Sequence, residues 1–361
     1  MERVYPENQW VTPVELFKPY YGYTIANFIL NQMEDRKMRK LKVLEIGPGT
    51  GTMADSLLDF YKNYNLDLYR DCEYTFVEIS PQLAEKCERL MVQNHRELWE
   101  SNRIKIFNGS ILDYKKRNLT GLTTYVIALE VLDNLPHDRL YFNQKRDQLT
   151  SQTMVRIQRN SDGSETLEDY QEEISDPLCK TFADLYLSLP EKDHVSATRV
   201  LQREGVFKRL QDSLSSWRHK EAMTSNVFAP TGALEVIQHL KQVVPDHCLV
   251  LADFDSFIYP RNSIRGVNAP LVTNKLKDPT QWQTFDTYLI KRGEADICFQ
   301  VNFNFLQHAY QQLTGFHARV LKTAEFVDQY ALRSWCTTQN MYNPMREEYF
   351  NTSIMVTDRL H

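Results

Sequence analysis

The amino-acid sequence predicts a doubly wound α/β fold that is preceded by helices and interrupted by an insertion. A short apolar run, Leu41–Gly47, ends in a cluster of glycines, as a buried parallel strand typically does. Strand-like and helix-like segments alternate after it up to about residue 130, and the alternation resumes near residue 231. This rhythm indicates a parallel sheet joined by right-handed crossovers.

The elements of the first half follow from apolar periodicity and from the placement of proline and glycine. Residues 13–34 suit one or two amphipathic helices that separate near Lys18-Pro19. The polar stretch from Asn63 to Asp71 is expected to be a loop. Strands are predicted at 41–47, 74–80, 103–109 and 123–130, and helices at 52–64 and 81–99.

The pattern changes after Tyr141. Residues 146–173 are polar, alternate over Met154 to Gln158 and carry a turn signal at Ser161-Asp162-Gly163, which predicts an exposed hairpin. Residues 177–222 are helical in character. A helix at 231–244 and strands at 247–254, 287–293, 295–303, 318–323 and 351–358 complete the prediction. The expected segments are 1–40 (helical), 41–140 (ligand-binding α/β core), 141–225 (inserted hairpin and helices) and 226–361 (remainder of the core).

Composition narrows the class of protein. The chain has 361 residues, of which 42% are hydrophobic, so it can bury a substantial core as one elaborated domain or two. A net charge of -5 does not favour nucleic acid as a partner. Six scattered cysteines without a C-x-x-C pair, and histidines without ligand spacing, indicate free thiols and no metal site. No signal peptide or membrane-spanning segment is apparent, and we expect an intracellular protein.

The strongest ligand-binding signal is the run from Glu45 to Gly51, which contains Gly47, Pro48 and Gly49. It follows a strand and opens a helix, which is where an open α/β sheet binds its ligand. The spacing E-x-G-x-G-x-G differs from the dinucleotide fingerprint and is the one used for adenosyl ligands without a pyrophosphate. The helix N-terminus is suited to a carboxylate of the ligand, and Glu45 to a polar group of the loop or, through water, to an ammonium.

Two further positions are predicted to contact such a ligand. Glu78 ends the second strand, where a carboxylate can accept hydrogen bonds from both hydroxyls of a ribose. After the third strand, Ser110, Ile111 and Asp113 are placed to contact an adenine ring. The alternative for this last segment is a plain helix cap made by Ser110 or Asp113.

The segment after the fourth strand is the predicted acceptor site. Glu130 and Asp133 are three residues apart and could together neutralise a guanidinium, which would leave in-line placement of its nitrogen as the main requirement. His137 is kept as a minor candidate. The alternative interpretation is a turn in which Asp133 caps the backbone.

Several segments together resemble the MidA-like family, which are S-adenosylmethionine-dependent methyltransferases of mitochondria and bacteria with a class I, Rossmann-like methyltransferase fold. The segments that carry the resemblance are WVTPVE with Phe17 and Tyr21-Gly22 (an entry helix with T-x-P-E), EIGPGTGTMADSLL, LEVLDNLPHDRL, VLADF (the family's I-D-Y-G) and ADICFQVNFNFL. The resemblance implies S-adenosylmethionine as cofactor, Gly47, Gly49, Gly51 and Glu78 as cofactor positions, and Glu130 and Asp133 as the acidic pair.

Four positions depart from the family pattern. The residues present are Leu129 for asparagine, Asp255 for glycine, Gln300 for histidine and Asn302 for aspartate, and the glycine-rich stretch upstream of the entry helix is missing. These departures lie on the acceptor side, whereas the cofactor loop is intact.

The function predicted is therefore methyl transfer from S-adenosylmethionine to a protein side chain. The mitochondrial members of the family are protein arginine methyltransferases that serve assembly of respiratory complex I, which implies an arginine acceptor, a mitochondrial location and a partner from a respiratory or assembly complex. Two alternatives are a catalytically silent assembly factor and an RNA methyltransferase. The basic clusters at 36–42 and 115–117 are too short to indicate an RNA-binding face.

Overall fold

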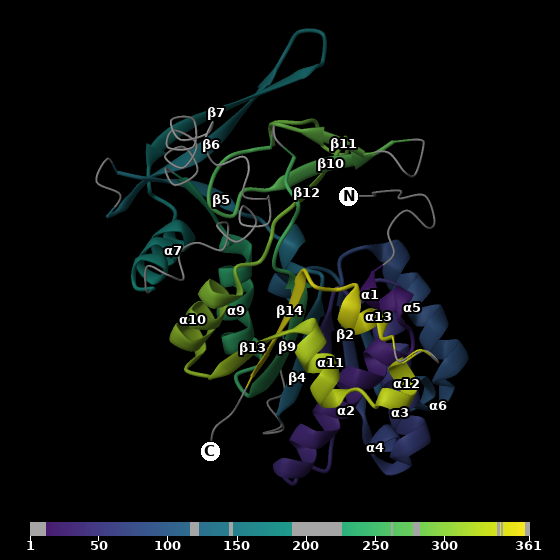
Figure 1. The fold of residues 1–361 in the computed structure, drawn as a ribbon. Helices are drawn as coiled ribbons and strands as arrows, with labels where there is room; N and C mark the ends of the chain where they lie inside the picture. The colour runs from purple at the N-terminus through teal and green to yellow at the C-terminus, as the bar shows by residue number, and fades with distance from the viewer. Residues whose placement is uncertain are drawn as a thin grey trace. The chain divides into compact units, whose positions relative to one another are not determined.

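The computed structural model consists of two compact units, each formed from separate parts of the chain (Figure 1). Unit 1 comprises Met1–Val131, Val236–Asp253 and Leu313–His361, and unit 2 comprises Leu132–Glu235 and Phe254–Gln312. The structure describes residues 12–115, 123–143, 147–189, 226–260, 263–276, 282–337, 340 and 342–357. Trp10-Val11 of the entry segment, most of the cluster 115–117 and residues 190–222 of the predicted helical region lie outside these ranges.

A seven-stranded sheet forms the centre of unit 1. Its order is β13-β14-β9-β4-β1-β2-β3. β1 pairs in parallel with β2 and β4, β2 with β3, and β4 with β9, whereas β13 is antiparallel to β14. The strands are β1 Lys42–Ile46, β2 Glu73–Glu78, β3 Ile104–Asn108, β4 Thr124–Leu129, β9 His247–Phe254, β13 Ala318–Lys322 and β14 Thr352–Thr357. The predicted parallel sheet and its two late strands are confirmed.

Helices of unit 1 alternate with these strands, and Figure 1 shows α2, α3, α11 and α13 gathered at one side of the sheet. The helices are α1 Pro13–Leu16, α2 Tyr20–Asp35, α3 Thr52–Tyr64, α4 Leu66–Asp71, α5 Pro81–Asn94, α6 Arg96–Glu100, α9 Thr231–Val243 (which begins in unit 2), α11 Thr323–Tyr330, α12 Arg333–Cys336 and α13 Pro344–Glu347, with the 3-10 turn η1 Ile111–Asp113. None of the helices in the described ranges is long and apolar enough to cross a membrane.

Two predictions for this half are corrected. The stretch from Asn63 to Asp71 is not a loop, because Asn65 caps α4 by accepting a hydrogen bond from the Leu68 amide at 3.1 Å, and Leu68 and Tyr69 are buried. The helix predicted at 81–99 is broken at His95, where α5 ends and α6 follows. The buried His95 ring lies 3.2 Å from Asp55 and 3.3 Å from the Tyr69 hydroxyl, and these contacts hold the bend in place.

Unit 2 contains two antiparallel sheets. One has the order β7-β6-β5-β8 and the other β11-β10-β12. Its elements are β5 Asp138–Phe142, β6 Leu149–Arg159, β7 Glu165–Glu173, β8 Asn226–Ala229, β10 Leu271–Lys275, β11 Trp282–Phe285, β12 Asp296–Cys298, the helices α7 Pro177–Leu187 and α10 Phe303–Thr314, and the 3-10 turn η2 Leu132–Asn134. The predicted hairpin is confirmed as β6 and β7, with Gly163 at φ +80° in its turn.

Other predictions for unit 2 are wrong in part. The strand expected at 287–293 is absent, and β11 ends at Phe285 because the chain turns there, with Thr287 accepting from the Leu289 amide at 3.0 Å. Of the strand expected at 295–303, only β12 forms. The chain enters helix α10 instead, and Asn302 caps that helix by accepting a hydrogen bond from the Phe305 amide at 3.1 Å. The four segments expected from composition stay a prediction, and the structure groups residues 254–312 with unit 2.

A large apolar core joins one face of the unit 1 sheet to α2, α3 and α5. Helix α2 packs tightly against α3 at Gly22, where an added Cβ would lie 2.4 Å from the Cβ of Ser56. A glycine is needed there because both atoms belong to helices that are themselves held in the core.

We expect Gly22→Ala to lower the free energy of unfolding by about 1 to 3 kcal/mol, because the added methyl group overpacks this helix contact. Urea denaturation followed by circular dichroism measures the change. The matched control is Asn31→Ala on the exposed side of the same helix, which should alter stability by less than about 0.5 kcal/mol. Equal stability of Gly22→Ala and wild type would contradict the packing assigned to this contact.

Glu45 is a buried carboxyl in the same core. It shares a strand face with Val43, is 3% exposed and accepts a hydrogen bond from the Tyr74 hydroxyl at 2.8 Å. Burial raises the pKa of Glu45 to about 7, an effect that the Tyr74 hydrogen bond partly offsets and the nearby Glu78 reinforces. The folded chain therefore holds this proton more tightly than the unfolded chain, in which the carboxyl keeps its ordinary pKa of 4.5.

This raised pKa predicts a pH dependence of stability in the protein without ligand. The contribution of the bound proton is complete below about pH 4.5 and is lost as the pH rises to about 7. Wild type should therefore lose roughly 1 to 3 kcal/mol relative to Glu45→Gln across this window, since glutamine has no proton to lose. Urea denaturation at a series of pH values tests this. Parallel stability curves for the two proteins would show that Glu45 does not titrate as described.

Candidate cofactor and acceptor sites

The loop between β1 and α3 is built on three glycines with positive φ. Gly47, Gly49 and Gly51 have φ of +66°, +57° and +89°, which side chains with a Cβ rarely adopt. The Gly47 amide donates to the Val77 carbonyl at 2.9 Å, and the Gly51 amide to the carbonyl of Pro48 at 2.9 Å. The loop is thereby tied to β2 and closed by an internal turn.

The same loop is packed at its ends and open in the middle. A Cβ at Gly47 would lie 2.9 Å from Cγ2 of Val131, and one at Gly51 would lie 2.9 Å from Sγ of Cys87. At Gly49 no described protein atom lies within 4 Å of the Cβ position. The open centre of the loop is the place where a ligand can approach the backbone closely.

Glu78 faces this open centre from the end of β2. It is 4% exposed, and its carboxylate accepts from the Gly49 amide at 3.2 Å and from the Ser80 amide at 2.8 Å. Burial raises the pKa of Glu78, and the amides of Ser80, Gly49 and Ile79 partly offset the rise. A carboxylate can accept about four hydrogen bonds, so Glu78 keeps capacity for a ligand hydroxyl. Its predicted contact with a ribose stays a prediction.

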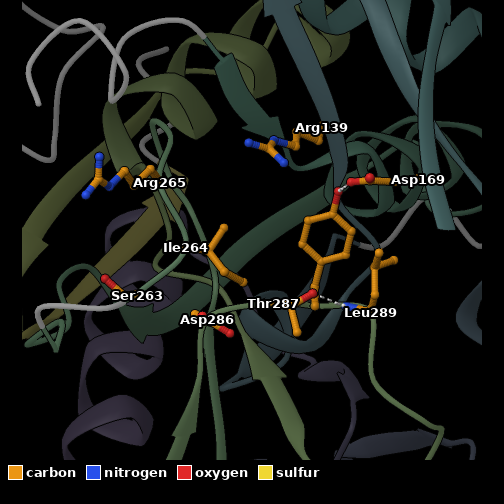
Figure 2. Close-up of a pocket in the computed structure, with 9 residues that line it drawn as sticks. Arg139, Asp169, Ser263, Ile264, Arg265, Asp286, Thr287 and Leu289 are labelled. Carbon is orange, nitrogen blue, oxygen red and sulfur yellow. Dashed lines mark hydrogen bonds between the residues drawn. The ribbon is translucent and has the colours of Figure 1, made fainter. Parts of the chain in front are cut away.

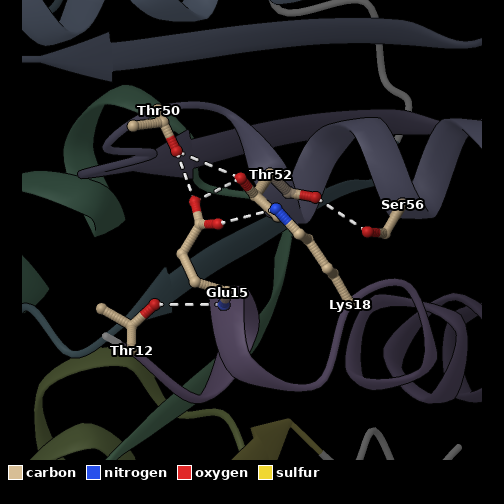
Figure 3. Close-up of polar contacts among 6 residues, drawn as sticks. All are labelled: Thr12, Glu15, Lys18, Thr50, Thr52 and Ser56. Atoms are coloured by element: carbon tan, nitrogen blue, oxygen red, sulfur yellow. Dashed lines mark hydrogen bonds and ion pairs between the residues drawn. The ribbon is translucent and has the colours of Figure 1, made fainter. Parts of the chain in front are cut away.

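A second carboxylate reaches the loop from α1 (Figure 3). Glu15 accepts hydrogen bonds from the hydroxyl of Thr50 at 2.6 Å and from that of Thr52, and it forms an ion pair with Lys18 at 3.3 Å. Burial raises the pKa of Glu15, but the two threonine hydroxyls and the Lys18 charge outweigh it, so the net pKa lies below its ordinary value. Glu15 therefore fastens the start of α3 to the entry helix.

The other residues predicted to contact the cofactor form hydrogen bonds within the core or within their own turn. The Glu45 carboxyl is bonded to Tyr74 in the core, and no described contact joins it to the glycine loop. Ser110 accepts from the Leu112 amide at 3.2 Å and caps the turn η1, as the alternative interpretation expected. Ile111 is buried and Asp113 exposed. Their predicted contact with an adenine ring stays a prediction.

A narrow pocket lies at the carboxyl ends of β4 and β9, within unit 1. Its walls include Glu130, Asp253, Tyr21 and Tyr349, and its volume of about 10 Å³ is room for one water molecule. The Glu130 amide donates to the Ala252 carbonyl at 2.8 Å, which places the two strand ends side by side. Glu130 has φ +54°, a conformation that is uncommon for a residue with a side chain and concentrates at functional sites.

The two tyrosines of this pocket have raised pKa values, because they are buried next to ionisable groups. Burial raises the pKa of Tyr21, and Glu130, Tyr349 and Asp253 raise it further. The pKa of Tyr349 is also raised, by burial first and then by Glu130. Both phenols therefore stay protonated and can act as hydrogen-bond donors beside the carboxylates.

Asp133 and His137, the other predicted acceptor residues, belong to unit 2. Burial raises the pKa of Asp133 to about 6, although the Asn134 side chain donates to it at 2.6 Å. His137 is stacked on Phe299 with ring centroids 3.7 Å apart, and burial lowers its pKa to about 4. Its Nδ1 lies 2.9 Å from the Leu135 carbonyl. A neutral, stacked imidazole of this kind is typical of a packing residue.

Sequence reasoning missed Asp253, Tyr21, Tyr349 and Glu15 as site residues. A signal existed for three of them. Asp253 matches the aspartate of I-D-Y-G in the MidA-like pattern, and Glu15 and Tyr21 lie in the entry segment that resembles the same family. Tyr349 carries no motif, because only the fold brings it to the end of β4.

The unit 1 site fits an adenosyl cofactor. Gly49 provides open backbone, Glu78 provides a carboxylate with remaining acceptor capacity, and the thirteen-residue helix α3 presents its N-terminus beside the loop. Among the described residues, no cluster of histidine, cysteine, aspartate and glutamate side chains suits a metal ion.

Comparison with known proteins agrees with this geometry. Residues 24–322 match the model of a family described as "Putative S-adenosyl-L-methionine-dependent methyltransferase". A Burkholderia thailandensis protein crystallised with S-adenosyl-homocysteine is similar over 97% of this chain and 79% of its own, with 14% identity and a TM-score of 0.60. A second structure from that organism, of an uncharacterized protein of the same superfamily, covers 97% and 81%, with 14% identity and a TM-score of 0.58.

Curated relatives match a smaller part. Ribosomal RNA small subunit methyltransferase A of Mycolicibacterium vanbaalenii is 33% identical over 97 residues, which are 27% of this chain and 25% of the relative. The protein of the same name from Mycobacterium tuberculosis is 30% identical over 96 residues, with the same two coverages. The chain thus spans about a quarter of the length of these relatives.

The family match covers well over half of the chain, and the solved structures share its fold. The predicted class I methyltransferase fold and S-adenosylmethionine cofactor are confirmed, as is the MidA-like resemblance. This chain belongs to that family of S-adenosyl-L-methionine-dependent methyltransferases.

Proposed function

We propose that this methyltransferase methylates a nitrogen of a protein side chain, the guanidinium of arginine, in the pocket at the ends of β4 and β9. The observation that carries the proposal is the presence of two carboxylates, Glu130 and Asp253, in the walls of one pocket. Val131, the residue after Glu130, packs against the cofactor loop at Gly47. The acceptor pocket and the cofactor loop are therefore adjacent within unit 1.

Two carboxylates suit a guanidinium better than a neutral acceptor. A planar cation with five N–H donors can be shared between acids that approach from different strand ends. Tyr21 and Tyr349 add phenol rings and hydroxyls to the same walls, and aromatic faces also attract a guanidinium. Because the pocket holds only about one water, entry of the acceptor requires side-chain movement. Tyr349, which is only partly buried, is the aromatic wall best placed to move.

The bound cofactor supplies an electrophilic methyl group on a sulfonium. In this chain, the loop Gly47–Gly51, the N-terminus of α3 and Glu78 would hold it. Glu130 and Asp253 would hold the guanidinium so that one nitrogen is aligned for in-line attack, which removes most of the entropic barrier. One of these two carboxylates would accept the proton that the nitrogen loses when its new bond forms.

The proposal replaces one of the two acidic residues that the sequence predicted for the acceptor site. The sequence paired Glu130 with Asp133, but Asp133 lies in unit 2 and is engaged by Asn134. Asp253 lines the same pocket as Glu130, so we assign it the second acidic role. His137 is not used in the mechanism.

We extend the proposal to the biological setting that the MidA-like resemblance implies: a mitochondrial location and a respiratory or assembly complex as the source of the protein substrate. The ribosomal RNA methyltransferase relatives favour RNA as the second candidate substrate. Strand β7 disfavours it, because its sequence ETLEDYQEE contains five acidic and no basic residues and would repel a phosphate backbone. Labelled methyl transfer into a mitochondrial extract treated with ribonuclease or with protease separates the two substrates.

We expect Gly49→Arg to weaken S-adenosylmethionine binding by a factor of about 100 or more, because the side chain fills the open centre of the loop. Calorimetric titration measures the affinity. Gly163→Arg is the matched control, since Gly163 in the β6-β7 turn also has positive φ and open space around its Cβ position. A similar loss of affinity in both variants would show that strain, and not occupation of the site, is responsible.

Replacing the two acceptor carboxylates, as Glu130→Gln with Asp253→Asn, should lower the rate of methyl transfer by at least about 100-fold. Cofactor affinity should change by less than about threefold, since neither residue is assigned to the cofactor. Single-turnover transfer of labelled methyl groups and calorimetry measure the two quantities. Asp133→Asn is the comparison variant and should retain most activity. Full activity in the double variant would refute the acceptor site.

A further inference from the structure

Unit 2 contains a separate open cavity of about 370 Å³ (Figure 2). Its lining comes from four parts of unit 2: Arg139 on β5, Asp169 on β7, and the segments 263–265 and 286–289. Figure 2 shows the guanidinium of Arg139 extending toward the side of the cavity that carries Arg265. None of these residues takes part in the sites of unit 1.

Arg139 is held rigidly in this wall. Its Nε donates to the side-chain oxygen of Asn226 at 3.1 Å, and its guanidinium carbon lies 5.2 Å from the ring centre of Tyr141 and 5.4 Å from that of Phe228. Asn226 is itself confined, because a Cβ on Gly266 would lie 2.2 Å from the same oxygen. The guanidinium plane is therefore positioned before any ligand arrives.

Within the described ranges, no ion pair joins Arg139 to a carboxylate. Its contacts are with the Asn226 side chain, with the rings of Tyr141, Phe228 and Tyr288, and with the Tyr288 hydroxyl. Asp169, the acid in the same wall, accepts a hydrogen bond from the Tyr288 hydroxyl. A guanidinium held in this way has terminal N–H groups that can bind a planar oxyanion through two parallel hydrogen bonds.

We propose that Arg139 binds a carboxylate of an acidic side chain in the protein substrate. This inference rests on the proposed function and adds to it a required feature of the substrate sequence. The cavity also contains Asp169 and Asp286, and β7 beside it is strongly acidic. A polyanion such as RNA would be repelled there, whereas a peptide of mixed charge can satisfy both signs.

The test uses the full chain and fluorescein-labelled peptides that contain one arginine and several glutamates, compared with the same peptides in which glutamine replaces glutamate. Fluorescence polarisation measures their binding without methyl transfer. Wild type should bind the glutamate peptides at least about tenfold more tightly. Arg139→Gln should remove this preference without changing the affinity for the glutamine peptides, and Arg139→Lys should restore only part of it, because lysine lacks the planar fork.

Arg156→Gln is the matched control. Arg156 lies on β6 and stacks on Tyr170 at 5.1 Å, outside the cavity. Three outcomes would each overturn the assignment. They are a preference for the glutamate peptides that survives in Arg139→Gln, an equal loss of this preference in Arg156→Gln, and the absence of any preference in wild type. Displacement of the glutamate peptide by an RNA oligonucleotide, dependent on Arg139, would also overturn it in favour of a phosphate ligand. Peptide preference without any methyl transfer would support this site while removing the proposed function.

Discussion

The hydrogen bond from the Gly49 amide to the Glu78 carboxylate links the two strands that define the cofactor site. Because Glu78 ends β2 and Gly49 lies beyond β1, this contact sets the path of the loop before α3 begins. The neighbouring contacts depend on that path: Gly47 against Val131, and Gly51 against Cys87. A loop that turned differently would misplace both the cofactor site and Val131, the residue that follows Glu130.

The sequence predicted the parts of the fold whose signals are local. The glycine loop, the parallel strands and the β6-β7 hairpin are marked by short motifs, and all were confirmed. The caps at Asn65 and Asn302 were missed because one asparagine in a polar stretch does not distinguish a helix start from a loop. Asp253 was missed as a site residue for another reason: its relation to Glu130 depends on the pairing of β4 with β9, which are far apart in sequence.

The motif located the loop, but it did not predict the direction in which the Glu45 side chain points. In a parallel strand buried on both faces, apolar residues surround every position, so alternation does not reveal which way a polar side chain points. The structure places Glu45 on the core face with Val43, against the Tyr74 hydroxyl. An acidic residue beside a cofactor loop can therefore serve the packing of the strands that position the loop, and its raised pKa follows from that burial.

The division into two units separates the proposed cofactor and acceptor sites from most of the departures from the MidA-like pattern. The cofactor loop, Glu78, Glu130 and Asp253 all belong to unit 1, whereas three of the four departures from the MidA-like pattern, at Asp255, Gln300 and Asn302, belong to unit 2. At one of these positions a structural use is visible, since Asn302 caps α10. Methyl transfer requires the same alignment of methyl donor and nitrogen for every acceptor. The residues that recognise the substrate chain around the acceptor can differ from one substrate to another. Departures that fall largely in unit 2 therefore agree with the proposed function, in which the transfer chemistry is retained and the protein substrate differs.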